Sequence, residues 1–147
     1  MGKWEVKLIH RKKMTDLDFT PEQMRDIAQL SRNSVFNRIR SAVDVNDNPA
    51  PPLKSQRYAA WKVGKFGRFG ATDKRDWFRT GHTMRALQVL RATVNEAVVG
   101  FTDATSNLRA RMNQRLWRQF GVSPKDKEVI VRAITDQLQA KSKSKVA

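Results

Sequence analysis

Hydrophobic and charged residues alternate at the beginning of the chain, over residues 3–10. A period of two predicts a strand with one buried side. Farther along, segments 87–94 and 97–101 are rich in strand-forming residues and are separated by Asn95-Glu96, which is hairpin spacing. The pattern therefore predicts a small antiparallel sheet made of an N-terminal strand and a hairpin.

A helical period begins after Thr20-Pro21-Glu22-Gln23. Thr20 is a typical helix cap, Pro21 suits the first helical position, and Gln23 completes a capping box. The apolar stripe of this helix consists of Met24, Ile27, Ala28, Val35, Ile39 and Ala42. Leu30 and Phe36 lie off the stripe, which favours a second contact surface on the outer side of the helix.

Two more helices are predicted in the C-terminal third of the chain. The first spans residues 105–120, stops at Gly121, and has one face formed by Leu108, Met112, Leu116 and Phe120. The second begins at the cap Ser123, and its apolar residues Val129, Ile130, Val131, Ala133, Ile134 and Leu138 cover roughly 200°. So wide an arc is typical of a helix deep in a core or one mated with another subunit. Residues 141–147 are expected to form a disordered basic tail.

The segment between these elements reads as a long loop, about residues 44–80. Prolines favour extended backbone over residues 44–52. The three glycines Gly64, Gly67 and Gly70 argue against a helix or strand, apart from one helical turn near residues 58–61. We therefore expect an α+β fold in a single domain, residues 1–140, with the sheet covered by three helices and a long extended basic loop.

The net charge of the chain says more about its function than its length does. The 147 residues carry a formal net charge of +15. Within residues 53–92, ten Lys and Arg face two acids, a local excess of +8 (10 minus 2). This balance favours acidic partners, either nucleic acid or an acidic protein surface. The chain has no cysteine, which excludes disulfides and thiolate chemistry, and no apolar run approaches the ~18 residues of a membrane span.

Catalytic chemistry has little support in the residues. The two histidines, His10 and His82, lack a recognisable acid–base partner, and no His or carboxylate recurs at metal-ligand spacing. The glycine triplet lacks the Gly-Lys-Ser/Thr ending of a phosphate-binding loop. We expect no enzyme activity, no metal and no cofactor.

Two binding features remain. Arg111, Arg115 and Arg118 would share a face of a helix without acids, where they can bind external anions or simply remain solvated. The basic and aromatic residues of segment 64–70 can stack on single-stranded bases, or can insert into pockets of a neighbouring subunit. We favour insertion, because no recognisable RNA-binding signature frames the segment.

Four stretches follow one another along the chain: PPLK at 51–54 with Tyr58 and Lys62, residues 75–87 around Thr80-Gly81, AVVGF at 97–101, and RQFGVSPKD at 118–126. In this order they resemble stretches of phage virion-morphogenesis and tail-completion proteins. The chain departs from the family pattern at Arg79, where an apolar residue is usual, and its basic arm is longer. The resemblance implies a structural protein that forms a homo-oligomeric ring at the phage head–tail junction and bridges portal-side and tail-side proteins.

On this interpretation the partners are other copies of the chain, the portal or connector and tail proteins, and packaged DNA. The protein would reside in the virion neck after assembly in the host cytoplasm, without a membrane. The expected subunit contacts are Leu30, Phe36, Trp61, Phe66, Phe69, Trp77, Phe78, Ile130 and Ile134. The residues expected to face acidic partners or DNA are Lys62, Lys65, Arg68, Arg111, Arg115 and Arg118. The alternative is a nucleic-acid-binding protein that uses the basic aromatic arm.

Overall fold

The fold is α+β, and its sheet has the predicted composition. The computed structural model describes residues 5–9, 19–115 and 117–146. Strand β1 (Glu5–Ile9) and strand β2 (Leu87–Ala92) both pair antiparallel with β3 (Glu96–Phe101), which gives the order β1-β3-β2. The hydroxyl of Thr93 accepts hydrogen bonds from the N–H groups of Asn95 and Glu96 and so closes the β2–β3 turn. The predicted hairpin is confirmed.

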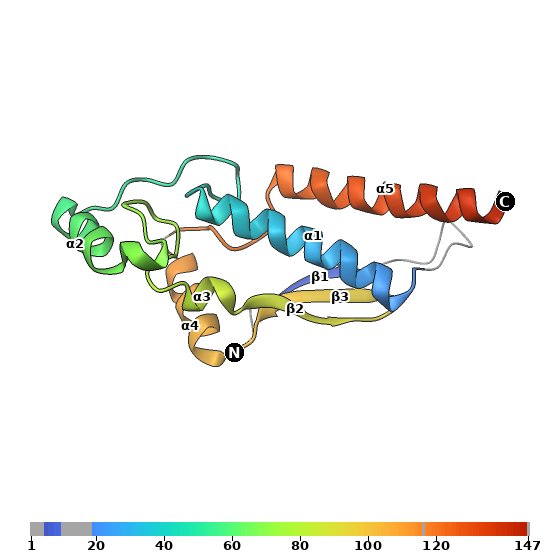
Figure 1. The fold of residues 1–147 in the computed structure, drawn as a ribbon, viewed down its shortest axis with the longest axis horizontal. Coiled ribbons are helices and arrows are strands. Elements are labelled where there is room, and N and C mark those ends of the chain that lie inside the picture. The colour runs from blue at the N-terminus through green and yellow to red at the C-terminus, as the bar shows by residue number, and fades with distance from the viewer. Residues whose placement is uncertain (1–4, 10–18, 116, 147) are drawn as a thin grey trace.

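Helix α1 (Pro21–Arg40) is the central element of the fold. The Thr20 hydroxyl accepts from the N–H of Gln23, and the Gln23 side chain accepts from the N–H of Thr20, so the predicted capping box is present. The whole predicted apolar stripe is buried. Figure 1 shows α1 lying between the sheet and helix α5 (Pro124–Val146), and α1 contacts both.

Helix α5 begins as predicted at Ser123. Ser123 and Asp126 exchange backbone–side-chain hydrogen bonds of 3.0 and 3.1 Å, which forms a reciprocal cap. Asp126 is buried and also pairs with the buried Arg38 of α1 at 2.8 Å, so the cap fixes α5 to α1. The helix continues to Val146, so the prediction of a disordered tail from residue 141 is wrong for residues 141–146.

The core lies where α1 meets the sheet and α5. Its buried apolar residues are Phe19, Met24, Ile27, Ala28, Val35, Ile39, Met84, Ala86, Leu87, Ala97, Val99, Phe101, Ala110, Phe120, Ile130 and Ala133. The prediction that three helices cover the sheet is only partly met, because α1 and α4 (Ala104–Gln114) contact strands whereas α5 packs on α1.

The prediction of a long extended loop is wrong. Ser55 caps a helix, α2 (Gln56–Phe66), and a 3-10 turn, η1 (Gly67–Phe69), follows it directly. A short helix, α3 (His82–Arg85), ends the segment. We call residues 56–85 the basic lobe. Figure 1 shows α2 at one end of the molecule, beyond the C-terminal end of α1 and opposite the C-terminus of α5.

The loop before the lobe also differs from the extended form expected from its prolines. Val43 and Pro49 form an isolated antiparallel bridge. Inside this loop the Asp44 carboxylate accepts from the N–H groups of Asn46 and Asn48 at 2.8 and 2.9 Å. An Asp side chain that binds the backbone two residues on is a turn-forming feature. The turn lies before Pro49, and a proline restricts only the residue directly before it, so the prolines do not oppose this turn.

Helix α4 is shorter than predicted and is rotated relative to the prediction. It ends at Gln114, whose side chain both donates to the carbonyl and accepts from the N–H of Phe120. These bonds turn Phe120 into the core outside the helix. The buried face of α4 consists of Ser106 and Ala110, whereas Leu108 and Met112, predicted to share one apolar face with Phe120, are exposed. Two small residues let the helix approach β3 closely, which a stripe of large residues does not.

Candidate interaction surface

A buried carboxylate holds the basic lobe to the rest of the molecule. Asp76 is 0% exposed, and its two oxygens lie 2.8 Å from Lys62 Nζ and 2.9 Å from an Arg40 nitrogen. The Thr72 hydroxyl and the Phe78 N–H also donate to Asp76, at 2.7 and 3.0 Å. A buried charge is tolerated only when it is paired and fully hydrogen-bonded, and Asp76 meets both conditions.

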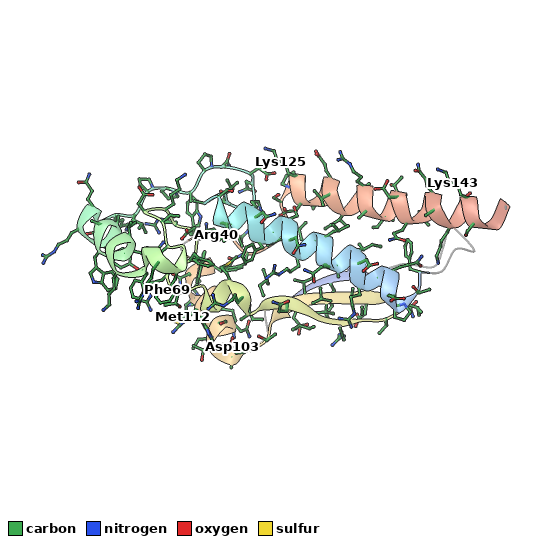
Figure 2. The ribbon with its side chains drawn as sticks, in the orientation of Figure 1. Arg40, Phe69, Asp103, Met112, Lys125 and Lys143 are labelled. Carbon is green, nitrogen blue, oxygen red and sulfur yellow. The ribbon has the colours of Figure 1, made fainter. Side chains whose placement is uncertain are left out.

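The Asp76 cluster joins three separate parts of the chain. Arg40 ends α1, Lys62 lies in α2, and Asp76 lies in the segment that leads to α3. Arg40 also donates to the Gly70 carbonyl at 3.1 Å, and its guanidinium lies 3.8 Å from the centre of the Phe78 ring. Together, these contacts give the lobe a defined position on α1. In Figure 2, Arg40 points from α1 toward the lobe.

The lobe exposes large aromatic side chains. Tyr58, Trp61 and Phe69 are 41%, 43% and 45% exposed, and Phe66 is half-buried. Trp61 contacts Tyr58 at 5.5 Å and Phe66 edge-on at 5.3 Å between ring centres. We call Tyr58, Trp61, Phe66 and Phe69 the lobe aromatics. They include three of the predicted partner anchors, and α2 and η1 present them at the end of the molecule.

Cationic side chains lie close to these aromatic rings. Lys65 lies 5.5 Å from the Trp61 ring centre and 5.7 Å from that of Phe66, and Arg68 lies 4.7 Å from that of Phe69. Both side chains are exposed, so they remain available to an acidic partner. Lys62, predicted to face such a partner, is only 5% exposed and is bound to Asp76. Lys62 therefore holds the lobe together and is not available to an external anion.

Trp77 and Phe78, predicted as anchors for a partner, pack inside their own chain. Trp77 contacts the buried Phe120 edge-on at 4.8 Å, and it adopts a positive φ of 58°. Phe78 is half-buried beneath Arg40. Both rings pack against the core, because the turn at Asp76 directs the chain back toward the sheet.

Of the predicted subunit contacts on α1 and α5, one is exposed and the others are buried or half-buried. Leu30 is 48% exposed, whereas Phe36 is half-buried against the core, with the Arg32 guanidinium 4.5 Å from its ring centre. Ile130 is buried and Ile134 is partly buried against the same core. The wide apolar arc of α5 therefore faces α1 on one side, while Val129 and Val131 are 38% and 62% exposed on the other.

The predicted arginine face does not form as a unit. Arg111 lies in α4, Arg115 is the residue that ends the helix, and Arg118 follows in the loop, where its carbonyl accepts from the N–H of Val45. The helix stops too early for the three side chains to share one face. Any role of these arginines toward an anion remains a prediction.

No metal-binding group of three or more His, Cys, Asp or Glu occurs among the described residues. His82 Nε2 lies 3.5 Å from a carboxylate oxygen of Asp103. Asp103 caps α4, and the hydrogen bond from the Ser106 N–H holds the pKa of its carboxyl below its usual range. Within the described part of the chain, no helix is long and apolar enough to cross a membrane.

Sequence reasoning missed the central role of Asp76 and counted it only as one of two acids in a cationic segment. Its partners Lys62 and Arg40 are 14 and 36 residues away, so no local motif connects them. Comparisons with family models, with curated proteins and with solved structures each find no match.

Proposed function

We propose that this protein is a structural component of a phage virion. It forms a homo-oligomeric ring at the head–tail junction and bridges portal-side and tail-side proteins. Two lines of reasoning support the proposal. One is the set of stretches, in a shared order, that resemble tail-completion proteins. The other is the position of the lobe aromatics on a projecting part of the molecule.

The observation that carries the proposal is the exposure of Tyr58, Trp61 and Phe69, each above two-fifths, on a lobe fixed by a buried ion cluster. Large aromatic residues that fill partner pockets dominate the binding energy of interfaces. A lobe already fixed on its own chain loses little entropy on binding. Exposed rings on a rigid support are therefore suited to assembly.

A ring also needs a second, different surface on each copy. A contact between unlike surfaces can repeat around an axis and close. Away from the lobe, several large apolar side chains are exposed on α4 and α5: Leu108, Met112, Val129 and Val131. In the proposed ring, the lobe aromatics of one copy contact such a surface of the next copy.

The proposal is tested by light scattering coupled to size-exclusion chromatography over a range of protein concentrations. We expect the unaltered protein to form oligomers, and we expect the double substitution Trp61→Ala with Phe69→Ala to shift it to monomer. Truncating an anchor residue costs about 2 kcal/mol or more per interface. Val94→Ala is the matched control, since Val94 is 44% exposed but lies in the hairpin turn. A monomer at every concentration, with or without connector protein, would overturn the proposal.

A second function, binding of single-stranded nucleic acid, is supported by the cations beside the exposed rings. Lys65 and Arg68 lie next to Trp61 and Phe69, and stacking rings flanked by cations are the usual components of such sites. Titration with oligothymidylate at two salt concentrations tests it. Tight, salt-sensitive binding lost in the Trp61→Ala/Phe69→Ala protein, together with a monomeric state, would favour this function over ring assembly.

A further inference from the structure

A cavity of about 390 Å³ opens between the basic lobe and α4. Its walls come from α2, from residues 74–83 of the lobe, and from α4 with the segment 117–119 that follows it. Figure 1 shows α2 and α4 at the same end of the molecule. A volume of several hundred Å³ is the usual size of a ligand site. The cavity has room for a few side chains of a bound segment.

The charge of the cavity wall has one sign. No Asp or Glu lines it, but five cationic residues do: Lys62, Lys74, Arg75, Arg79 and Arg109. Lys62 is neutralised by Asp76. Within the described residues, the other four have no ion-pair partner; Arg75 donates to the Pro52 carbonyl and Arg79 lies 5.4 Å from the Phe66 ring centre. Four cations around one cavity favour an anionic occupant.

Three of the four aromatic residues of the wall are already in contact with other groups, and the fourth, Trp117, is half-buried. Trp77 packs on Phe120, Phe78 lies under the Arg40 guanidinium, and Tyr58 lies against Trp61. Stacking of nucleic-acid bases needs open ring faces, so these contacts reduce the ring surface that the cavity offers to bases.

The amide groups of the wall are also engaged. Gln119 Nε2 donates to the Arg75 carbonyl at 2.7 Å, and Asn113 Nδ2 donates to the Arg109 carbonyl at 2.9 Å. One N–H group of each amide is thus engaged within the chain, and the four cations supply the charged donors to an occupant. Carboxylates suit such donors better than bases do, because guanidinium groups bind carboxylates in a two-pronged geometry.

We propose that this cavity binds an acidic peptide segment of another protein. Asp and Glu side chains of that segment pair with Lys74, Arg75, Arg79 and Arg109, while its apolar side chains contact the ring edges of the wall. An acidic segment suits the cavity better than a second copy of this chain, because each copy carries +15 and repulsion opposes the approach of another copy to a cationic wall. In addition, the chain's own hydrogen bonds engage many of its carboxylates: Asp44, Asp47, Asp76, Asp103 and Asp126. The inference goes beyond the proposed ring and holds whether or not copies of the chain assemble.

The test uses the full chain and a synthetic peptide in which Asp and Glu surround a central Leu-Phe pair, with binding followed by calorimetry. A peptide with Asn and Gln in place of the acids is the neutral control, and oligothymidylate is the competing anion. The variant Lys74→Gln with Arg109→Gln removes two exposed cations of the cavity. Its matched control, Arg25→Gln with Lys143→Gln, removes two exposed cations on α1 and α5; Lys143 is labelled in Figure 2 near the opposite end of the molecule.

We expect the acidic peptide to bind, the neutral peptide not to bind, and the Lys74/Arg109 variant to lose about tenfold or more in affinity. The Arg25/Lys143 control should lose about twofold or less, because neither residue lines the cavity and exposed charges away from the site are screened by salt. Equal losses of peptide affinity in the two variants would mean that the peptide is held by general charge attraction, and would overturn the proposed binding site. Tighter binding of oligothymidylate with the same dependence on Lys74 and Arg109 would assign the cavity to nucleic acid instead. Light scattering without peptide reports ring assembly separately.

Discussion

Replacing Asp76 by Asn tests whether the buried ion cluster holds the basic lobe in place. The change keeps the shape of the side chain and removes its charge. It leaves Lys62, 5% exposed, as a buried cation without a counter-ion, and it weakens the pairing of Arg40. At 2.8 Å the gross attraction of one such pair is about 6 kcal/mol at an effective dielectric constant of about 20. Desolvation offsets part of this, and removing one partner of a buried pair costs about 3–5 kcal/mol.

A loss of that size is large against a typical stability of about 5–15 kcal/mol. We expect the midpoint of thermal unfolding, followed by circular dichroism, to fall by on the order of 10 °C. Proteolytic cleavage within residues 64–70 should become faster, because the lobe loses its attachment to α1. Asp73→Asn is the control: it makes the same charge change at an exposed residue three positions earlier.

The double substitution Asp76→Asn with Lys62→Met separates the charge effect from simple damage to packing. If the unpaired Lys62 causes the loss, removing its charge should restore part of the stability. A single Asp76→Asn protein as stable as Asp73→Asn would refute the reasoning. So would a double variant less stable than the single one.

Three further predictions concern the lobe and the helix caps. Gly64→Ala should stabilise the protein by about 0.5–1 kcal/mol in urea unfolding, because Gly64 lies within α2 and an added Cβ meets nothing within 4 Å. Gly81→Ala should destabilise it by about 1–3 kcal/mol in the same assay: Gly81 has a φ of +80°, and its Cβ would lie 2.7 Å from the Phe78 ring. Asp103 has a lowered pKa, so the stability it contributes is present above its ordinary pKa and is lost as pH falls through the folded value. Between about pH 5 and about pH 2, the midpoint of thermal unfolding should therefore fall less steeply with pH in Asp103→Asn, which keeps a capping side chain, than in the unaltered protein. An unchanged slope would contradict the assignment of this pH dependence to Asp103.

Local signals predicted the fold where the responsible contacts lie within a few residues. The capping boxes at Thr20 and Ser123 are satisfied by partners three residues away, and both helices begin where expected. The hairpin turn is likewise closed by bonds within residues 93–96. In each case a short stretch of sequence contains both the donor and the acceptor.

The basic lobe was not predictable in this way, because non-local contacts decide its structure. A glycine in a helix costs about 1 kcal/mol, and the sequence analysis gave that cost too much weight. The Ser55 cap and the tie from Lys62 to Asp76 both favour α2, and the second depends on the folded chain. The same holds for α4, where the bonds from Gln114 to Phe120 end the helix early and bring Phe120 into the core.

The two proposed surfaces should respond to salt in opposite directions. The lobe aromatics would join copies that each carry +15, so repulsion between copies opposes the contact. The cavity would bind a segment of opposite charge, so attraction assists it. The screening length shortens from about 10 Å at 0.1 M to about 3 Å at 1 M ionic strength, so added salt weakens both the repulsion between copies and the attraction of the acidic segment. We therefore expect added sodium chloride to increase the oligomeric fraction in light scattering and to lower the affinity for the acidic peptide. If both fall together as salt rises, copies of the chain associate through charged groups, and the lobe aromatics are not the main contact.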